Sequence, residues 1–206
     1  MTSESDWTVH PRSGLGRLEF GMSPAQVDAL AAPYGAVTCR GADRVADEML
    51  RETLAMFGDA LSEDEKQAFI AEYTGSGPSA DSVTETRGDL VLRYEADRLC
   101  EIMHSRRPLF LDGSDLFALA GLDALRLLER CNQGPGRYAD TEAAFDELAI
   151  SVDGFSVHES ASGVLALDDS DERFRQRAVM LRDAPYFPAQ ETQRYTVQSL
   201  PPATDR

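Results

Sequence analysis

The chain has 206 residues, 42% of them hydrophobic, and a formal net charge of −16 at pH 7. This length is enough for a single large domain, and the apolar content is ordinary for a globular protein. No segment approaches the roughly 18 apolar residues that a transmembrane helix needs, and the N-terminus lacks the pattern of a secretory signal. We therefore expect a cytoplasmic protein, and the negative charge argues against nucleic acids and acidic membranes as partners.

The polar motifs predict neither a metal nor a cofactor. Cys39, Cys100 and Cys131 are widely spaced and include no C-x-x-C pair, which predicts reduced, mostly buried thiols. The stretches DGSD at 112–115 and DDSDE at 168–172 are rich in oxygen ligands. Each precedes a predicted helix, so we expect their carboxylates and hydroxyls to cap helices, with calcium or magnesium binding as the alternative.

The first predicted corner joins a strand to a helix. Leu15 to Phe20 read as part of an N-terminal strand region, which breaks at Gly21. Ser23 is a suitable N-cap, and Pro24 fits the first helical position because it has no amide hydrogen to lose. We expect this helix to stop near 33–35.

A pair of helices is predicted over 43–73. An apolar stripe at helical spacing fills its first part, and Gly58 ends that helix. Ser62 and Glu65 form a capping box for the second helix. The polar segment 75–82 is the best candidate for an internal linker.

The middle of the chain predicts a hairpin followed by the most apolar helix. Alternation over 89–95 and 98–104 indicates two strands, with Ala96–Asp97 as the turn. After a short strand at 109–111, Ser114 is expected to cap a buried helix, whose apolar residues lie over 116–128 and which ends before Gly134.

The last third predicts further strands and one more helix. A short helix is expected over 141–145, and the Asp153–Gly154 turn predicts a hairpin between strands at 148–152 and 155–159. Another strand is expected at 164–167. A helix is then predicted over 171–182, and residues 183–206 read as an irregular tail.

Together these elements predict an α+β fold in a single domain, with antiparallel sheet packed by helices. The order of elements recurs, which suggests two pseudo-repeat halves at 7–105 and 106–182, each built as strand, helix and meander. The helical pair over 43–73 would then be an insertion in the first half.

The opening segment GLGRLEFGMSPAQVDAL resembles a strand-to-helix motif of several families of small bacterial proteins. These are immunity-like proteins of polymorphic toxin systems, outer-membrane assembly lipoproteins and tandem-repeat β-lactamase inhibitory proteins. The lipoproteins carry a lipidated N-terminal cysteine, whereas the first cysteine here is Cys39. The resemblance implies a protein-binding or inhibitory role, and it rests on Gly16, Leu18, Phe20, Gly21, Met22, Ser23, Gln26 and Val27.

The acidic residues are concentrated in two segments. Residues 43–72 hold nine acids against three bases, and residues 138–172 hold ten acids and no Lys or Arg. Charge of one sign favours a partner of the opposite sign. We expect the second segment to supply a partner-binding surface that includes Asp140, Glu142, Asp146, Glu147, Asp153, Glu159, Asp168 and Asp169.

Three functions fit these patterns. The favoured one is a non-enzymatic, cytoplasmic immunity protein that neutralises a basic toxin domain. The second is an uncharacterised, hydrolase-like enzyme that uses His104 or His158 with a carboxylate. The third is a ligand-binding module with an apolar cleft.

Overall fold

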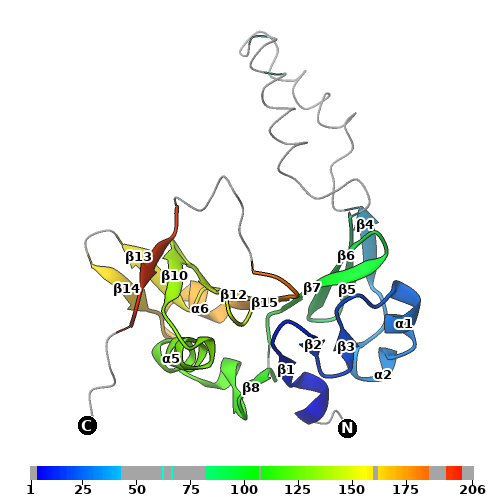
Figure 1. Ribbon diagram of the computed structural model, residues 1–206, viewed down its shortest axis with the longest axis horizontal. Helices are drawn as coiled ribbons and strands as arrows, with labels where there is room; N and C mark the ends of the chain where they lie inside the picture. The colour runs from blue at the N-terminus through cyan, green and yellow to red at the C-terminus, as the bar shows by residue number, and fades with distance from the viewer. Residues whose placement is uncertain are drawn as a thin grey trace.

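The protein is described by a computed structural model, which covers residues 4–42, 62, 66, 82–106, 108–159, 162–185 and 194–200. It has a mixed α+β fold built around one nine-stranded antiparallel sheet (Figure 1). In spatial order the strands are β16 (Thr196–Gln198), β10 (Gly136–Ala139), β11 (Glu142–Phe145), β12 (Ile150–Asp153), β15 (Ala178–Arg182), β7 (Arg98–His104), β6 (Leu90–Glu95), β5 (Ser82–Arg87) and β4 (Cys39–Ala42).

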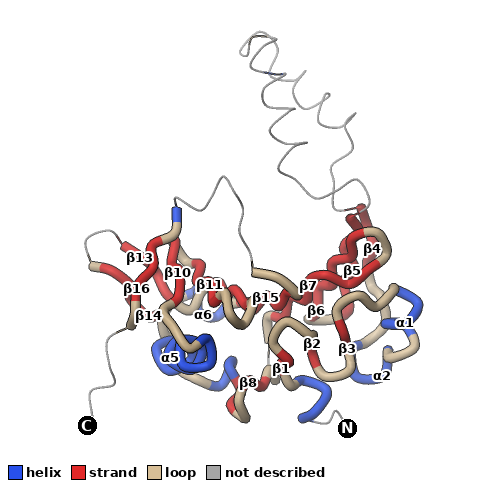
Figure 2. Tube along the Cα trace, viewed as in Figure 1, coloured by secondary structure: helices blue, strands red, loops and turns tan. Residues whose placement is uncertain are grey.

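Smaller sheets and helices accompany this sheet, and most of the helices lie along its lower side in Figure 2. The small sheets are β1 (Val9–His10), β2 (Gly14–Leu15) and β3 (Leu18–Glu19); β8 (Phe110–Leu111) and β9 (Ser114–Asp115); and β13 (Ser156–Glu159) and β14 (Gly163–Ala166). The helices are η1 (Glu4–Trp7), α1 (Pro24–Asp28), α2 (Ala31–Tyr34), η3 (Leu116–Ala118), α5 (Gly121–Asn132) and α6 (Glu172–Arg175).

The predicted strand-to-helix corner is confirmed, and it ties α1 to the large sheet. Ser23 and Gln26 form a capping box, with Pro24 in the first turn. Gly21 has a φ of 88°, a conformation that favours glycine. Its amide donates to the Leu99 carbonyl at 2.7 Å, and the Leu99 amide donates to the Met22 carbonyl at 2.8 Å. The corner is therefore hydrogen-bonded to β7.

Strand β15 joins the two parts of the sheet, and here the sequence-based prediction was wrong. Only Glu172–Arg175 of the helix predicted over 171–182 is helical. In β15, Val179 and Leu181 are buried while their neighbours are partly exposed, which is the period of two that a strand requires. Val179 pairs with His104 of β7, so a strand that is late in the sequence lies mid-sheet.

Three other local predictions were also wrong. Ser114 lies in β9 and caps no helix; Asp115 caps η3 instead, and α5 begins only at Gly121. The helix predicted at 141–145 is strand β11. The strands on either side of Asp153–Gly154 are formed, but they do not make a hairpin, because β12 pairs with β11 and β15 whereas β13 pairs with β14.

Two predictions concern segments that are described only in part. The helical pair over 43–73 and the linker lie outside the described residues, apart from Ser62 and Lys66 and the first residue of β5; the Lys66 amide donates to the Ser62 carbonyl at 3.0 Å. The tail is not wholly irregular, since β16 pairs with β10. The large hairpin is confirmed, with β6 and β7 joined at Ala96–Asp97.

A buried ionic cluster lies between β5 and the helices α1 and α2. The Arg87 side chain is fully buried and donates to Glu85 at 2.5 Å, to the Gly35 carbonyl at 3.2 Å and to Asp28. The Glu85 side chain is also fully buried, and its second oxygen lies 3.7 Å from Arg40. The cluster connects the sheet to the turn that ends α2.

Candidate functional site

Six of the eight carboxylates predicted to bind a partner gather at one end of the later part of the sheet. Backbone hydrogen bonds bring this end together, from the Gly154 amide to the Thr141 carbonyl at 3.1 Å and from the His158 amide to the Asp140 carbonyl at 2.6 Å. Gly154 also lies against the Arg173 backbone of α6. We call this region the acidic end; its carboxylates are Asp140, Glu142, Asp153, Glu159, Asp168, Asp169, Asp171 and Glu172.

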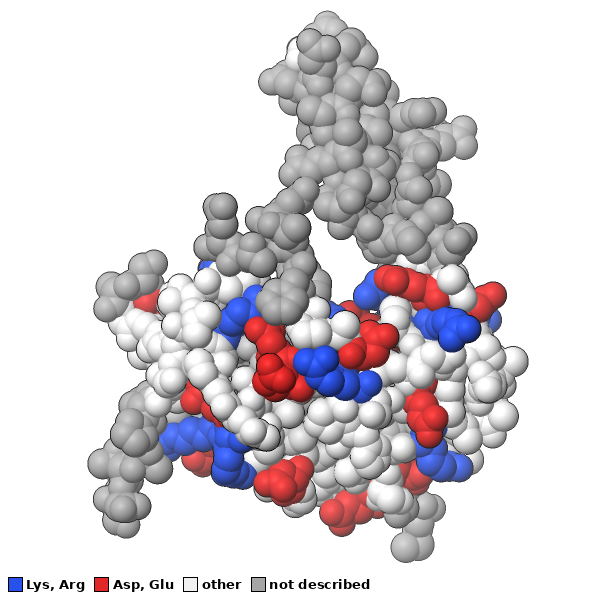
Figure 3. Space-filling model, viewed as in Figure 1, with Lys and Arg blue, Asp and Glu red and all other residues white. Residues whose placement is uncertain are grey.

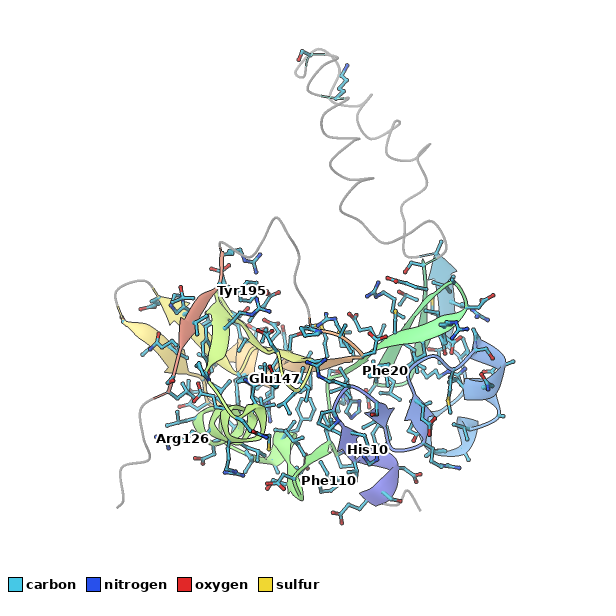
Figure 4. All side chains as sticks on the ribbon, viewed as in Figure 1. His10, Phe20, Phe110, Arg126, Glu147 and Tyr195 are labelled. Atoms are coloured by element: carbon cyan, nitrogen blue, oxygen red, sulfur yellow. The ribbon has the colours of Figure 1, made fainter. Side chains whose placement is uncertain are left out.

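Asp146 and Glu147 lie away from the acidic end, because β11 separates them from Asp140. The Asp146 carboxylate receives two hydrogen bonds from Arg137, at 2.8 and 2.9 Å. The Arg12 guanidinium donates to the carbonyls of both residues at 2.9 Å. Figure 4 accordingly shows Glu147 near the middle of the molecule. These contacts connect the N-terminal strands to the later part of the sheet.

Arginines from the chain itself neutralise part of the acidic end. Arg194 donates to Glu142 at 2.8 Å and lies 3.8 Å from Asp140. The Tyr195 hydroxyl also donates to Glu142, at 2.6 Å, and the Thr141 hydroxyl donates to Asp153 at 2.5 Å. On the face drawn in Figure 3, acidic and basic side chains likewise lie beside one another.

Three other predicted carboxylates of the acidic end are exposed to solvent, namely Glu159, Asp168 and Asp169. The ion pairs of Arg194 are made with Asp140 and Glu142 instead. The Asp168 carboxylate accepts hydrogen bonds from the amide and the hydroxyl of Ser170, and these bonds lower the pKa of Asp168. Hydrogen bonds from Arg173 lower the pKa of the neighbouring Asp171 to about 2. Both groups are therefore negatively charged at neutral pH.

A cavity of about 420 Å³ lies next to these carboxylates, between η3 and the loop before α6. Phe117 and Phe174 are almost completely buried beneath it. The Arg177 side chain lies 3.9 Å from the centroid of the Phe174 ring and donates to the Phe117 carbonyl at 2.6 Å. The lining residues are Phe117, Ala118, Leu119, Ala120, Asp168, Asp169, Phe174 and Arg177.

Neither this cavity nor Arg177 is predicted from the sequence. The aromatic residues that line the cavity, Phe117 and Phe174, come from η3 and α6, which are distant in the sequence. The signal that was available is the cluster FALA after the DGSD motif, where a polar N-cap is followed by an apolar turn. The same pattern also fits a long helix, in which these residues would lie along one buried face.

A second cavity, of about 570 Å³, lies over the small N-terminal sheet. Its lining includes His10, Arg12, Ser13, Glu19 and Phe20. His10 and Phe20, which are labelled in Figure 4, both line it. Arg12 already donates to the 146–147 turn, so its guanidinium has a structural role at this position.

The two histidines considered for catalysis lie in different surroundings. His104 is buried at the end of β7, whereas His158 is partly exposed on β13. The His104 ring stacks on Trp7 with centroids 4.8 Å apart, and its Nδ1 lies 3.3 Å from the Asp89 carbonyl oxygen. Its Nε2 is buried. The hydrogen-bonding contact of the His104 ring is therefore with a backbone carbonyl and not with a carboxylate, and catalysis by either histidine with a carboxylate stays a prediction.

We expect His104 to make folding stability depend on pH. Burial lowers the pKa of His104 below 6.5, so the unfolded chain takes up the proton first as the pH falls. The contribution of neutral His104 is complete above about pH 7 and declines as the pH drops through 6.5. Urea unfolding of the wild type and His104→Phe, followed by the fluorescence of Trp7, should therefore diverge between about pH 7 and pH 5.

The comparison of the two proteins also controls for the carboxylates near His104. Asp89 and Asp115 both act on the ring electrostatically and favour its protonation. They are present in both proteins, so their own titration cancels in the difference between wild type and variant. Parallel stability curves over this pH range would contradict a role for His104.

The three cysteines differ in their exposure. Cys39 is exposed, contrary to the prediction of mostly buried thiols, while Cys100 and Cys131 are partly buried. Burial raises the pKa of Cys100 to about 11.

Within the described ranges, no group of three or more His, Cys, Asp or Glu residues is placed to hold a metal ion. The helices described here include none with the length and apolarity to cross a membrane.

Comparisons with known proteins identify no relative. No family model matches the chain, and neither the curated proteins nor the solved structures contain a match.

Proposed function

We propose that the protein is a non-enzymatic inhibitor of the immunity type, which binds a basic bacterial toxin domain through its acidic end. The observation that carries this proposal is the grouping of eight carboxylates from β10–β13 and the α6 region at one end of the fold. Four arginines lie among them: Arg173, Arg175, Arg177 and Arg194. The acidic end therefore keeps a negative charge after its internal ion pairs are counted.

Such a surface acts mainly on the rate at which a partner arrives. Potentials of opposite sign steer two proteins together and raise the association rate, and salt screens this effect. Glu159, Asp168 and Asp169 are exposed, and the hydrogen bonds that Glu159 and Asp168 accept come from the uncharged Ser162 and Ser170, whereas Glu142 is paired with the positively charged Arg194. We therefore expect the first three residues to contribute most to steering.

The test uses the purified product of the gene immediately upstream, as an immobilised probe. We expect it to bind the wild type, and the triple variant Glu159→Gln/Asp168→Asn/Asp169→Asn to associate about tenfold more slowly at about 50 mM NaCl. The difference should shrink at about 500 mM NaCl, because exposed charges are then screened. Association and dissociation rates are read by biolayer interferometry.

The matched control removes the same charge elsewhere on the surface. Glu4, Glu19 and Asp97 are exposed and lie on η1, β3 and the β6–β7 turn. The triple variant Glu4→Gln/Glu19→Gln/Asp97→Asn should associate within about twofold of the wild type. No binding of the wild type at low salt would overturn the proposal, and so would equal losses in the two triple variants.

A further inference from the structure

The segment 194–200, which contains β16, is held in different ways at its two ends. At its later end, Leu200 is 8% exposed and belongs to the hydrophobic core. The Leu200 amide donates to both carboxylate oxygens of Glu129, at 3.1 and 3.2 Å. The Gly136 amide and the Tyr138 hydroxyl also donate to Glu129, so this carboxylate connects the end of the segment to α5 and β10. The later end is therefore an anchor in the core.

The earlier end of the segment is held by contacts at the surface. Arg194 lies 3.8 Å from Asp140 and donates to Glu142 at 2.8 Å. The hydroxyl of Tyr195, which Figure 4 labels, donates to Glu142 at 2.6 Å. The side chains of Arg194, Glu142 and Asp140 are 43%, 36% and 78% exposed. Because water and salt screen exposed ion pairs, such pairs contribute little to stability, and this end can open while Leu200 stays in place.

Arg194 and Tyr195 use acceptor sites that a basic partner would also use. Asp140 and Glu142 belong to the acidic end, and both hydrogen bonds to Glu142 converge on one oxygen, Oε2. A carboxylate oxygen offers about two acceptor sites, so these two donors fill that oxygen. A cationic group that approaches from outside therefore competes with Arg194 for the same carboxylate.

We infer that Arg194 and Tyr195 form an autoinhibitory latch over Asp140 and Glu142. When the complex forms, an arginine or lysine of the partner takes the place of Arg194, while Leu200 keeps β16 attached. A closed latch lowers the apparent affinity by the fraction of molecules in which the site is open, and we expect a loss of about threefold because the ion pairs are exposed. The inference rests on the proposed function and deepens it, because it describes how access to the acidic end is controlled.

The first test supplies an arginine from outside and needs no partner. The double variant Arg194→Gln/Tyr195→Phe removes the guanidinium and the hydroxyl that contact Glu142 and keeps the aromatic ring. Its probe is acetyl-Arg-Tyr-Thr-amide, which copies residues 194–196. Titrated into the ¹⁵N-labelled double variant, this peptide should shift the amide signals of Asp140 and Glu142. We expect it to bind the wild type about threefold more weakly, because Arg194 competes. Equal binding to both proteins, or none to the double variant, would overturn the inference.

A charge-matched variant separates the latch from a change in net charge. Arg175→Gln also removes one positive charge from the acidic end, but the Arg175 guanidinium donates to the backbone carbonyls of Asp169 and Ser170. At about 150 mM NaCl, where distant exposed charges are screened, it should bind the peptide within about 1.5-fold of the wild type. If Arg175→Gln strengthens binding as much as the double variant does, charge alone explains the effect and the latch is wrong.

Thermal unfolding checks that the latch is not a structural brace. The double variant should melt within about 3 °C of the wild type, because the contacts that it loses are exposed. A double variant that loses its fold would show that Arg194 and Tyr195 hold the sheet together, which also contradicts the latch.

The upstream gene product then distinguishes this inference from the proposed function. We expect it to bind the double variant about threefold more tightly than the wild type. In its complex with the ¹⁵N-labelled wild type, the backbone of Arg194 and Tyr195 should become more mobile while that of Leu200 stays rigid. If the wild type binds but the double variant binds no more tightly than Arg175→Gln, the latch is wrong and the proposed function stands. If neither protein binds, the proposed function fails, and the peptide titration still decides whether the latch excludes an external arginine.

Discussion

Arg87→Met is expected to lower the free energy of unfolding by about 3–5 kcal/mol. The substitution leaves Glu85 fully buried after it has lost its charge partner at 2.5 Å. Arg40 lies 3.7 Å from the other Glu85 oxygen, but its side chain is 45% exposed and replaces little of the lost interaction. Urea unfolding at pH 7, with the slope compared between proteins, measures the loss.

The double variant Glu85→Leu/Arg87→Met is the control for this prediction. It removes both buried charges, and apolar replacements of similar volume are often neutral for stability. We therefore expect it to recover most of the loss. If the double variant is as unstable as Arg87→Met, packing rather than the uncompensated carboxylate explains the effect.

Gly121→Ala is expected to destabilise the fold by about 3 kcal/mol. A Cβ atom at this position would lie 2.3 Å from the Leu167 carbonyl oxygen and 2.7 Å from that of Phe155. Both contacts are with backbone, so they cannot be relieved by moving a side chain. The start of α5 would have to shift away from the chain on either side of the β13–β14 pair, as thermal unfolding would show.

Gly134→Ala provides the matched control at the other end of the same helix. No atom lies within 4 Å of a Cβ placed there, and Gly134 does not have a positive φ. We expect its stability to stay within about 0.5 kcal/mol of the wild type. A similar loss in both variants would mean that the close approach at Gly121 does not explain the effect, because Ala favours a helix over Gly and propensity alone would not destabilise it.

The candidate site illustrates how far charge alone can be interpreted. The acid-rich segment 138–172 does supply most of the acidic end, because β10 to β13 bring its turns together. Asp146 and Glu147 are separated from it by the length of β11, which no count of charges indicates. One arginine that lies far along the chain, Arg194, neutralises both Asp140 and Glu142. Where charges lie in sequence is therefore different from where unneutralised charge lies in space.

Local chemistry was enough to predict the parts of the fold that are stabilised by neighbours in sequence. The Ser23–Gln26 capping box and the β6–β7 hairpin depend on residues a few positions apart, so their patterns are complete in the sequence. The α+β class follows in the same way, from segments whose apolar residues repeat with the period of a strand or of a helix.

Only the tertiary structure decided the elements whose partners are distant. β15 is a strand because β7 and β12 offer it hydrogen bonds on both edges, although its sequence next to α6 predicts a helix. β11 is a strand for the same reason, between β10 and β12. The start of α5 is set at Gly121, where a side chain would meet the backbone of residues 155 and 167. Propensity is a weak preference, and pairing and packing with distant segments outweigh it.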